Sequence, residues 1–299
     1  MTALRGLRSD ERFADVARQV ALSGDLKLAS EDPPFDTDGE RKETAALSLL
    51  FGVREPDLGG RGSMELDSLT YVHGDPADQQ EHCLRASDED EPNGTELAVN
   101  KCREYLLKTF NEALDGLGED GAPDINKRED LEITLGVRGQ VDVAVPVFYL
   151  RMGALLHAVQ DSFTHLLRAQ PDNLQVVSTL NWIDWVNDEF VESRDGHEHL
   201  AAMDNCEDDH PLLTVRRTLA ETASLEMLKA AYDPDLTREQ KLARAQEVID
   251  MYLTYKPSEC TADNRWCDAP ELDVPEKSAC LCQAPGAGAN AGTAAGGLG

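Results

Sequence analysis

One segment of the chain combines residue types that bind metal ions at a spacing that places them on one side of a helix. His157, Asp161 and His165 follow one another at intervals of four residues. In an α-helix their side chains fall within roughly 80° of one another, along about 12 Å of the axis. Imidazole and carboxylate groups are ligands of zinc and related cations. The spacing predicts a metal-binding stripe in which His157 and His165 each reach a separate cation, while Asp161 shares its two oxygens between them.

The simpler alternative is an amphipathic helix whose polar side faces solvent. Apolar residues do lie at helical spacing nearly opposite the stripe: Phe148, Met152, Leu155, Val159, Phe163 and Leu166. A solvated face, however, usually carries charged and polar side chains. Here the neighbours of the stripe are small or apolar: Leu150, Gly153, Ala154 and Ala158. Small residues leave room for an ion, a second helix or a substrate, and this favours the metal interpretation.

The elements that must position the stripe are mostly helical. Apolar periodicity predicts helices over 9–29, 40–53, 95–117, 145–169, 212–232 and 236–255. Residues 54–94 and 187–210 are rich in turn formers and ligand-type side chains, and we expect loops there. Glycines interrupt 129–143, which stays ambiguous. Residues 174–186 fit an extended piece that turns into a helix.

Composition narrows the class of protein. The chain has 299 residues, of which 41% are hydrophobic and 5% aromatic, with a formal net charge of −29. This is enough apolar material for one large globular domain or two modest ones. Nucleic acid is not expected as a partner, because phosphate contacts need lysine and arginine. Membrane docking through a basic patch is disfavoured for the same reason.

Cysteine usage points to an oxidising compartment. Seven cysteines are more typical of an exported than of a cytosolic protein. We predict that Cys260 pairs with Cys267, across a short segment with a turn, and that Cys83 and Cys102 are a candidate second pair. The start of the chain lacks an apolar signal core, so we interpret it as trimmed or misassigned.

Further candidate ligands lie in the predicted loops. Asp57 follows a proline at a helix end, and His82 stands beside a cysteine. His199 and Asp204 lie in the polar segment 187–210. We place the remaining histidines outside the ligand set: His73, His197 and His210.

This order of residues resembles the zinc-dependent phospholipase C superfamily, which includes single-strand-specific zinc nucleases and fungal heterokaryon-incompatibility proteins. The matching positions are Pro56-Asp57, then His82, then the central His157-x-x-x-Asp161 with His165, and last His199 with Asp204. The resemblance covers roughly residues 40–255 and is most specific in the central helix. It implies an all-α fold, a single multi-helix domain with long ligand-bearing loops.

The resemblance also implies the chemistry. Asp57 and Asp161 are the implied catalytic residues, with Asp57 both a ligand and a candidate general base. The full ligand set is Asp57, His82, His157, Asp161, His165, His199 and Asp204. We expect two Zn²⁺ ions rather than three, because the family's third zinc needs an early histidine and no histidine precedes His73. The implied substrate is a phosphodiester, most often a phospholipid head group.

Two further departures from the family concern the later ligands. The family usually has a longer gap between the positions of Asp161 and His165. It also usually ends in His-x-x-x-Glu, where this chain has His199 and Asp204. A rival interpretation is therefore a non-catalytic exported surface protein that retains the fold with a partial or structural metal site. A single-strand nuclease is disfavoured by the net charge of −29.

The expected organisation has four parts. Residues 1–39 form an N-terminal helical segment and loop, 40–256 the phospholipase C-like domain, 257–283 a cysteine-containing extension and 284–299 a flexible Gly/Ala-rich tail. Cys280-Leu-Cys282 and the tail resemble the opening of myxobacterial C-terminal sorting tails. This implies a cell-surface or extracellular protein whose membrane contact comes only through its substrate or a C-terminal anchor.

Overall fold

The computed structural model describes residues 38–61, 73–135, 139–204 and 210–269. These residues form seven α-helices: α3 (Asp38–Leu58), α5 (Gly94–Asp115), α6 (Val147–Asp161), α7 (Ile183–Val186), α8 (Glu192–Asp195), α9 (Pro211–Tyr232) and α10 (Arg238–Tyr252). Short 3-10 turns lie at Gln79–Glu81, Ala201–Asp204 and Trp266–Asp268. The helix expected at 9–29, Cys280, Cys282 and the tail at 284–299 lie outside the described residues.

The prediction of an all-α fold is wrong, because two small sheets accompany the helices. The first is an antiparallel hairpin of β1 (Arg128–Leu135) and β2 (Gly139–Pro146). Its apolar residues alternate with polar ones, so that Ile133, Val143 and Val145 are buried while Glu132 and Asp142 are exposed. This period of two is the pattern of a half-buried strand, and it resolves the ambiguous segment 129–143 as a hairpin.

The second sheet contains β3 (Leu166–Arg168), β4 (Val176–Asn181) and β5 (His197–Glu198). The helix predicted over 145–169 therefore ends earlier, at Asp161. Two hydroxyls donate to helix carbonyls at this end, Ser162 Oγ to the carbonyl of Val159 at 2.7 Å and Thr164 Oγ1 to that of Asp161 at 3.1 Å. Such side-chain bonds compete with helix continuation. The predicted extended piece and short helix over 174–186 are confirmed as β4 and α7.

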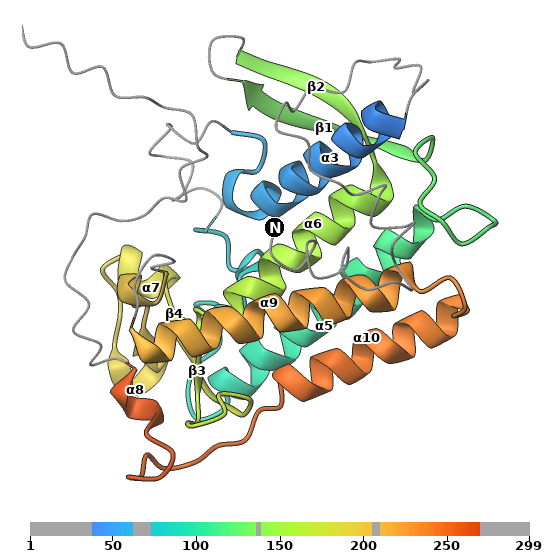
Figure 1. Ribbon diagram of the computed structural model, residues 1–299. Helices are drawn as coiled ribbons and strands as arrows, with labels where there is room; N and C mark the ends of the chain where they lie inside the picture. The colour runs from blue at the N-terminus through green and yellow to red at the C-terminus, as the bar shows by residue number, and fades with distance from the viewer. Residues whose placement is uncertain (1–37, 62–72, 136–138, 205–209, 270–299) are drawn as a thin grey trace, which may run out of the picture.

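The core forms around α6, which lies between α3 on one side and α5 and α9 on the other (Figure 1). Its apolar stripe is confirmed as buried: Phe148, Met152, Leu155 and Val159. Two glycines let α3 and α6 approach closely. A Cβ built on Gly52 would stand 2.0 Å from the carbonyl oxygen of Leu150, and one on Gly153 would stand 2.4 Å from that of Leu49. The backbones of the two helices are thus in contact.

The remaining helices begin and end near their predicted bounds. α9 starts at Pro211 behind His210, whose ring accepts a hydrogen bond from the amide of Leu212 at 3.2 Å. α10 starts with a capping box between Thr237 and Gln240. α3 extends beyond the predicted 40–53, and this places Asp57 in its last turn.

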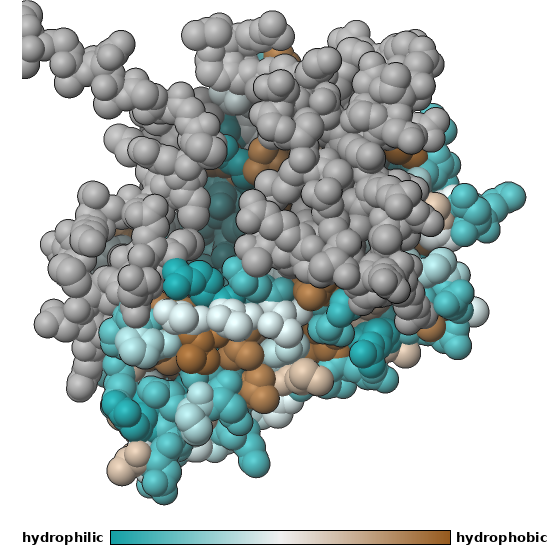
Figure 2. Space-filling model, in the orientation of Figure 1, coloured by the Kyte–Doolittle hydropathy of each residue, from teal (hydrophilic) through white to brown (hydrophobic). Residues whose placement is uncertain are grey.

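Both predicted disulfides are confirmed. Cys83–Cys102 ties the loop after the first 3-10 turn to α5, and Cys260–Cys267 closes a small surface loop. Disulfides of this kind are typical of oxidising environments. No helix among the described residues is long and apolar enough to cross a membrane. Figure 2 shows hydrophobic residues in small patches among hydrophilic ones over α9 and α10.

Candidate metal centre

The crossing of α3 and α6 places an acid against a histidine. Asp57 lies in the last turn of α3, and His157 lies one helical turn beyond Gly153 on α6. Asp57 Oδ1 is 3.7 Å from His157 Nε2. Because the two glycines bring the helices together, side chains as short as aspartate and histidine can meet across the interface.

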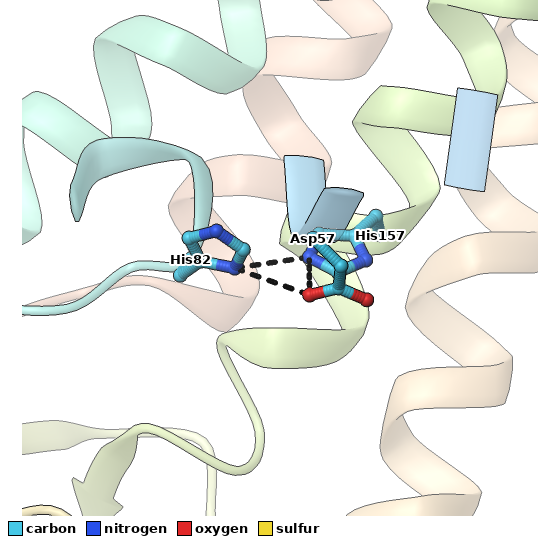
Figure 3. Close-up of side chains that lie close together, drawn as sticks. All are labelled: Asp57, His82 and His157. Carbon is cyan, nitrogen blue, oxygen red and sulfur yellow. Dashed lines mark hydrogen bonds and ion pairs between the residues drawn. The ribbon is translucent and has the colours of Figure 1, made fainter. Parts of the chain in front are cut away.

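His82 completes this group from the loop that follows the first 3-10 turn. Its Nδ1 lies 3.0 Å from His157 Nε2 and 4.0 Å from Asp57 Oδ1. Figure 3 shows the three side chains pointing toward one another from three different segments. One ligand atom from each lies within 4.8 Å of the others, so this first cluster of Asp57, His82 and His157 can hold a metal ion.

Asp161 joins the first cluster from the end of α6. Its Oδ2 is 3.0 Å from His157 Nε2 and 3.0 Å from His82 Nδ1. Four members of the implied ligand set, Asp57, His82, His157 and Asp161, therefore lie together in the structure. Asp161 Oδ2 also lies 3.8 Å from His165 Nδ1, so this carboxylate reaches toward a second group of ligands.

The second cluster contains His165, His199 and Asp204, which can also hold a metal ion. His165 Nε2 lies 3.4 Å from Asp204 Oδ1, and His199 Nε2 lies 3.1 Å from Asp204 Oδ2. The backbone of His199 is fixed by a hydrogen bond from its amide to the carbonyl of Asn181 at the end of β4, at 2.8 Å. The small sheet thus presents a ligand that the central helix cannot supply.

His73 lies beside the first cluster, although the sequence analysis placed it outside the ligand set. Its ring stacks on that of His82 with centroids 4.2 Å apart, and its Nε2 is 3.6 Å from Asp57 Oδ1. The flanking glycine, aspartate and proline indicated an exposed loop, and no local pattern signals the stacking. His197 belongs to neither cluster and faces the ring of Trp266 at 5.6 Å.

Two of the three histidines beside Asp161, His157 and His165, have raised pKa values. Burial lowers the pKa of His157, but the charge and hydrogen bond of Asp161 outweigh it and raise this pKa to about 9. The same opposition acts on His165, where burial is outweighed by Asp161 and Asp204 and the pKa rises to about 9. At neutral pH both rings carry protons that compensate the negative charges of Asp161 and Asp204.

Burial and the neighbouring charges also shift the pKa values of His82 and Asp161. Burial lowers the pKa of His82 to about 4, against the opposing hydrogen bond of Asp161. Burial raises the pKa of Asp161, but the charges of His157 and His165 overcome it and hold this pKa well below its usual range. A metal cation can take the place of the two ring protons, because it supplies the same positive charge to the same acids.

The distances fit a zinc-like ion. Two ligands at about 2.1 Å from a tetrahedral zinc lie roughly 3.4 Å apart. The ring nitrogens and carboxylate oxygens of the first cluster are separated by 3.0 to 4.0 Å, and those of the second include separations of 3.1 and 3.4 Å. Each cluster offers two imidazoles and one carboxylate, the donor set of catalytic zinc sites, and Asp161 adds a second carboxylate beside the first cluster.

Comparisons with family models, curated proteins and solved structures find no match to this chain.

Proposed function

We propose that the protein is an exported zinc-dependent phosphodiester hydrolase of the phospholipase C type. The observation that carries the proposal is the pairing of two His/Asp clusters around one carboxylate. Asp161 Oδ2 lies 3.0 Å from His157 Nε2 in the first cluster and 3.8 Å from His165 Nδ1 beside the second. In paired zinc sites, the two cations activate water and stabilise charge on a phosphoryl group held between them.

The histidines and the carboxylates of the two clusters have different roles in this proposal. His157, His165 and His82 are buried and hold the cations from the protein side. The carboxylates stand on the solvent side, with Asp57 43% and Asp204 41% exposed. A substrate can therefore approach over the carboxylates. Asp57 is the candidate general base, because one oxygen faces the cluster and the side chain remains accessible to water.

The substrate class follows from charge as well as from the clusters. A net charge of −29 repels a polyanion everywhere except at the cations themselves. A single phosphodiester in a lipid head group carries little such penalty. We therefore favour a phospholipid or a small phosphodiester over nucleic acid.

A non-catalytic surface protein with structural metal ions is the second candidate. Burial of the histidines favours it, since His82 is 0% exposed and His157 and His165 are each 7% exposed. Structural zinc sites are usually closed by four protein ligands. The exposed carboxylates of Asp57 and Asp204 favour the open, catalytic arrangement instead.

The test is metal analysis of the full chain followed by assays with a p-nitrophenyl phosphocholine analogue and single-stranded DNA. We expect about two zinc ions per chain and chelator-sensitive hydrolysis of the phosphocholine analogue. Two zinc ions without hydrolysis of either substrate would show that the metal is structural. A chain that binds no zinc would contradict both candidates, and faster cleavage of DNA would assign the nuclease class.

A further inference from the structure

The turn between Asp161 and His165 needs partners from elsewhere in the fold. The amides of Thr164 and His165 both donate to the carbonyl of Asp161, at 2.9 and 2.8 Å. The carbonyls of Ser162 and Phe163, by contrast, stand at a buried helix end where intrahelical donors have run out. Buried carbonyl groups without donors are costly, so this turn holds its shape only if other groups supply hydrogen bonds.

Two buried arginines supply them. Arg168 Nη2 donates to the carbonyl of Ser162 at 3.0 Å, and Arg216 Nη1 donates to that of Phe163 at 3.4 Å. Arg168, in β3, also donates to the carbonyl of Tyr252 at 2.6 Å and so ties the turn to the end of α10. Arg168 is 0% and Arg216 3% exposed, so neither guanidinium is available to a substrate.

Arg216 reaches a second segment as well. Its Nη1 lies 3.7 Å from the sulfur of Met203, the residue before Asp204. From one position on α9, Arg216 therefore contacts two segments that lead into ligands of the second cluster, through a backbone carbonyl in one and a side chain in the other. One is Phe163, two residues before His165, and the other is Met203. Among the described residues, the hydrogen bonds of Arg216 go to Phe163 and Met203 and none goes to Asp57, His82 or His157.

Burial of this cation is costly on its own account. Among the described residues no carboxylate forms an ion pair with Arg216, and its Nε and Nη2 lack hydrogen-bond partners. An unpaired buried charge destabilises a fold more than an apolar side chain of similar size would. The contacts that offset this cost are those to the Phe163 carbonyl and to Met203.

We propose that Arg216 is a positioning residue for the second cluster, which holds the His165 and Asp204 segments at the separation that a cation requires. The inference rests on the proposed function only in that this cluster takes a metal ion. It assigns no step of hydrolysis to Arg216. The proposal predicts a selective effect: loss of Arg216 weakens cation binding at the second cluster and leaves cation binding at the first cluster unchanged.

The test uses the neighbouring arginine as its control. Arg217 lies next to Arg216 on α9 but is exposed, with a contact to Thr214 at 3.5 Å. The metal-free full-length chain is titrated calorimetrically with Zn²⁺, and with Co²⁺ to record the absorption spectrum of each equivalent. For Arg216→Met we expect unchanged affinity for one equivalent and at least tenfold weaker binding of the other. Arg217→Met is expected to match the wild type.

The conservative variant Arg216→Lys keeps the charge and one donor, and we expect it to recover part of the lost affinity. It also serves if the methionine variant does not fold. Equal weakening of both equivalents, in step with a lower Tm, would show a merely structural role and overturn the proposal. Wild-type affinity in both variants would overturn it too, as would a wild type that binds fewer than two cations. If the wild type binds two cations but hydrolyses no substrate, the proposed phosphodiesterase activity is wrong, while the role of Arg216 in cation binding is unaffected.

Discussion

The imidazole Nδ1 of His165 donates a hydrogen bond of 2.7 Å to the backbone carbonyl of His82. The acceptor is a carbonyl, so the proton must lie on Nδ1, and Nε2 is left to face Asp204 at 3.4 Å. His82 meanwhile points its own ring into the first cluster. The side chain of His82 thus belongs to the first cluster, while its backbone carbonyl orients His165 in the second. A hydrogen bond of this kind fixes the tautomer of a metal-binding histidine.

Asp161 is the residue whose loss should matter most. Asp161→Asn keeps the volume of the side chain but removes the charge that lies 3.0 Å from His157 Nε2 and from His82 Nδ1. We expect release of at least one cation and a loss of hydrolysis of about 100-fold or more, by the usual sensitivity of such sites. Metal analysis after gel filtration, with turnover of the phosphocholine analogue, measures both.

Asp263→Asn, at an exposed position, is the control for Asp161→Asn. Full metal content and activity in Asp161→Asn would contradict the bridging role.

The disulfide beside His82 should support both clusters. Cys83 is adjacent to His82 in the chain, and its bond to Cys102 closes a loop with a sequence separation of 19. Loss of such a crosslink costs about 3 kcal/mol of stability in chain-entropy terms. In the double variant Cys83→Ala/Cys102→Ala we expect a lower Tm and weaker binding of both cations, since both depend on where His82 lies.

The second disulfide provides the matched control. Cys260 and Cys267 lie in a surface loop that contributes no ligand to either cluster. The variant Cys260→Ala/Cys267→Ala should therefore bind both cations with wild-type affinity. If the two double variants lose metal to the same extent, the effect is a general loss of stability and does not arise from His82.

Cation binding should release protons, because His157 and His165 have pKa values raised to about 9 in the metal-free chain. Both rings are protonated at pH 7 and must lose a proton to coordinate. Apparent affinity is then expected to rise from pH 6.5 to 9. The stability of the metal-free chain should change in the opposite direction. A raised histidine pKa stabilises the fold below pH 6.5, and this contribution is lost as pH rises through 9.

Calorimetric titrations in buffers of different ionisation enthalpy count the protons directly. We expect a total near two per chain at pH 7 when both clusters fill. Thermal melts of the metal-free chain across the same range check the second half of the prediction. An affinity that does not change with pH, with no proton release, would show that the two rings are already neutral.

The part of the site that the sequence predicted is the part carried by one continuous segment. The spacing of His157 and Asp161 is helical, and both lie on α6 as expected. His165 was expected on the same helix, but the hydroxyls of Ser162 and Thr164 bond to helix carbonyls and the chain turns away. His165 still reaches the site, by a turn rather than by helical periodicity.

The other parts of the site depend on tertiary contacts, which no local sequence pattern indicates. His73 stacks on His82, nine residues further along the chain, and this contact depends on the tertiary structure. The hairpin at 128–146 did have a local signal in its alternating residues, and the two interrupting glycines obscured it. The order of candidate ligands along the chain indicated which acids and histidines meet, while the separation between the clusters follows only from the small sheet and its loops.

The contact between Gly52 and Gly153 gives a test of how closely the first cluster depends on helix packing. In Gly153→Ala the new Cβ would meet the carbonyl of Leu49 at 2.4 Å and the Cα of Gly52 at 2.7 Å. Both are backbone atoms, so α3 must move away from α6 and carry Asp57 with it. Overpacking of this kind costs about 1 to 3 kcal/mol. We expect a lower Tm together with weaker binding at the first cluster, while the second cluster, whose ligands lie elsewhere, keeps its affinity.

Gly118→Ala is the control, because there the nearest atom is the flexible end of Asp120. Calorimetric titration resolves the two equivalents; an unchanged first equivalent in Gly153→Ala, despite the lower Tm, would mean that Asp57 is not needed to hold the cation.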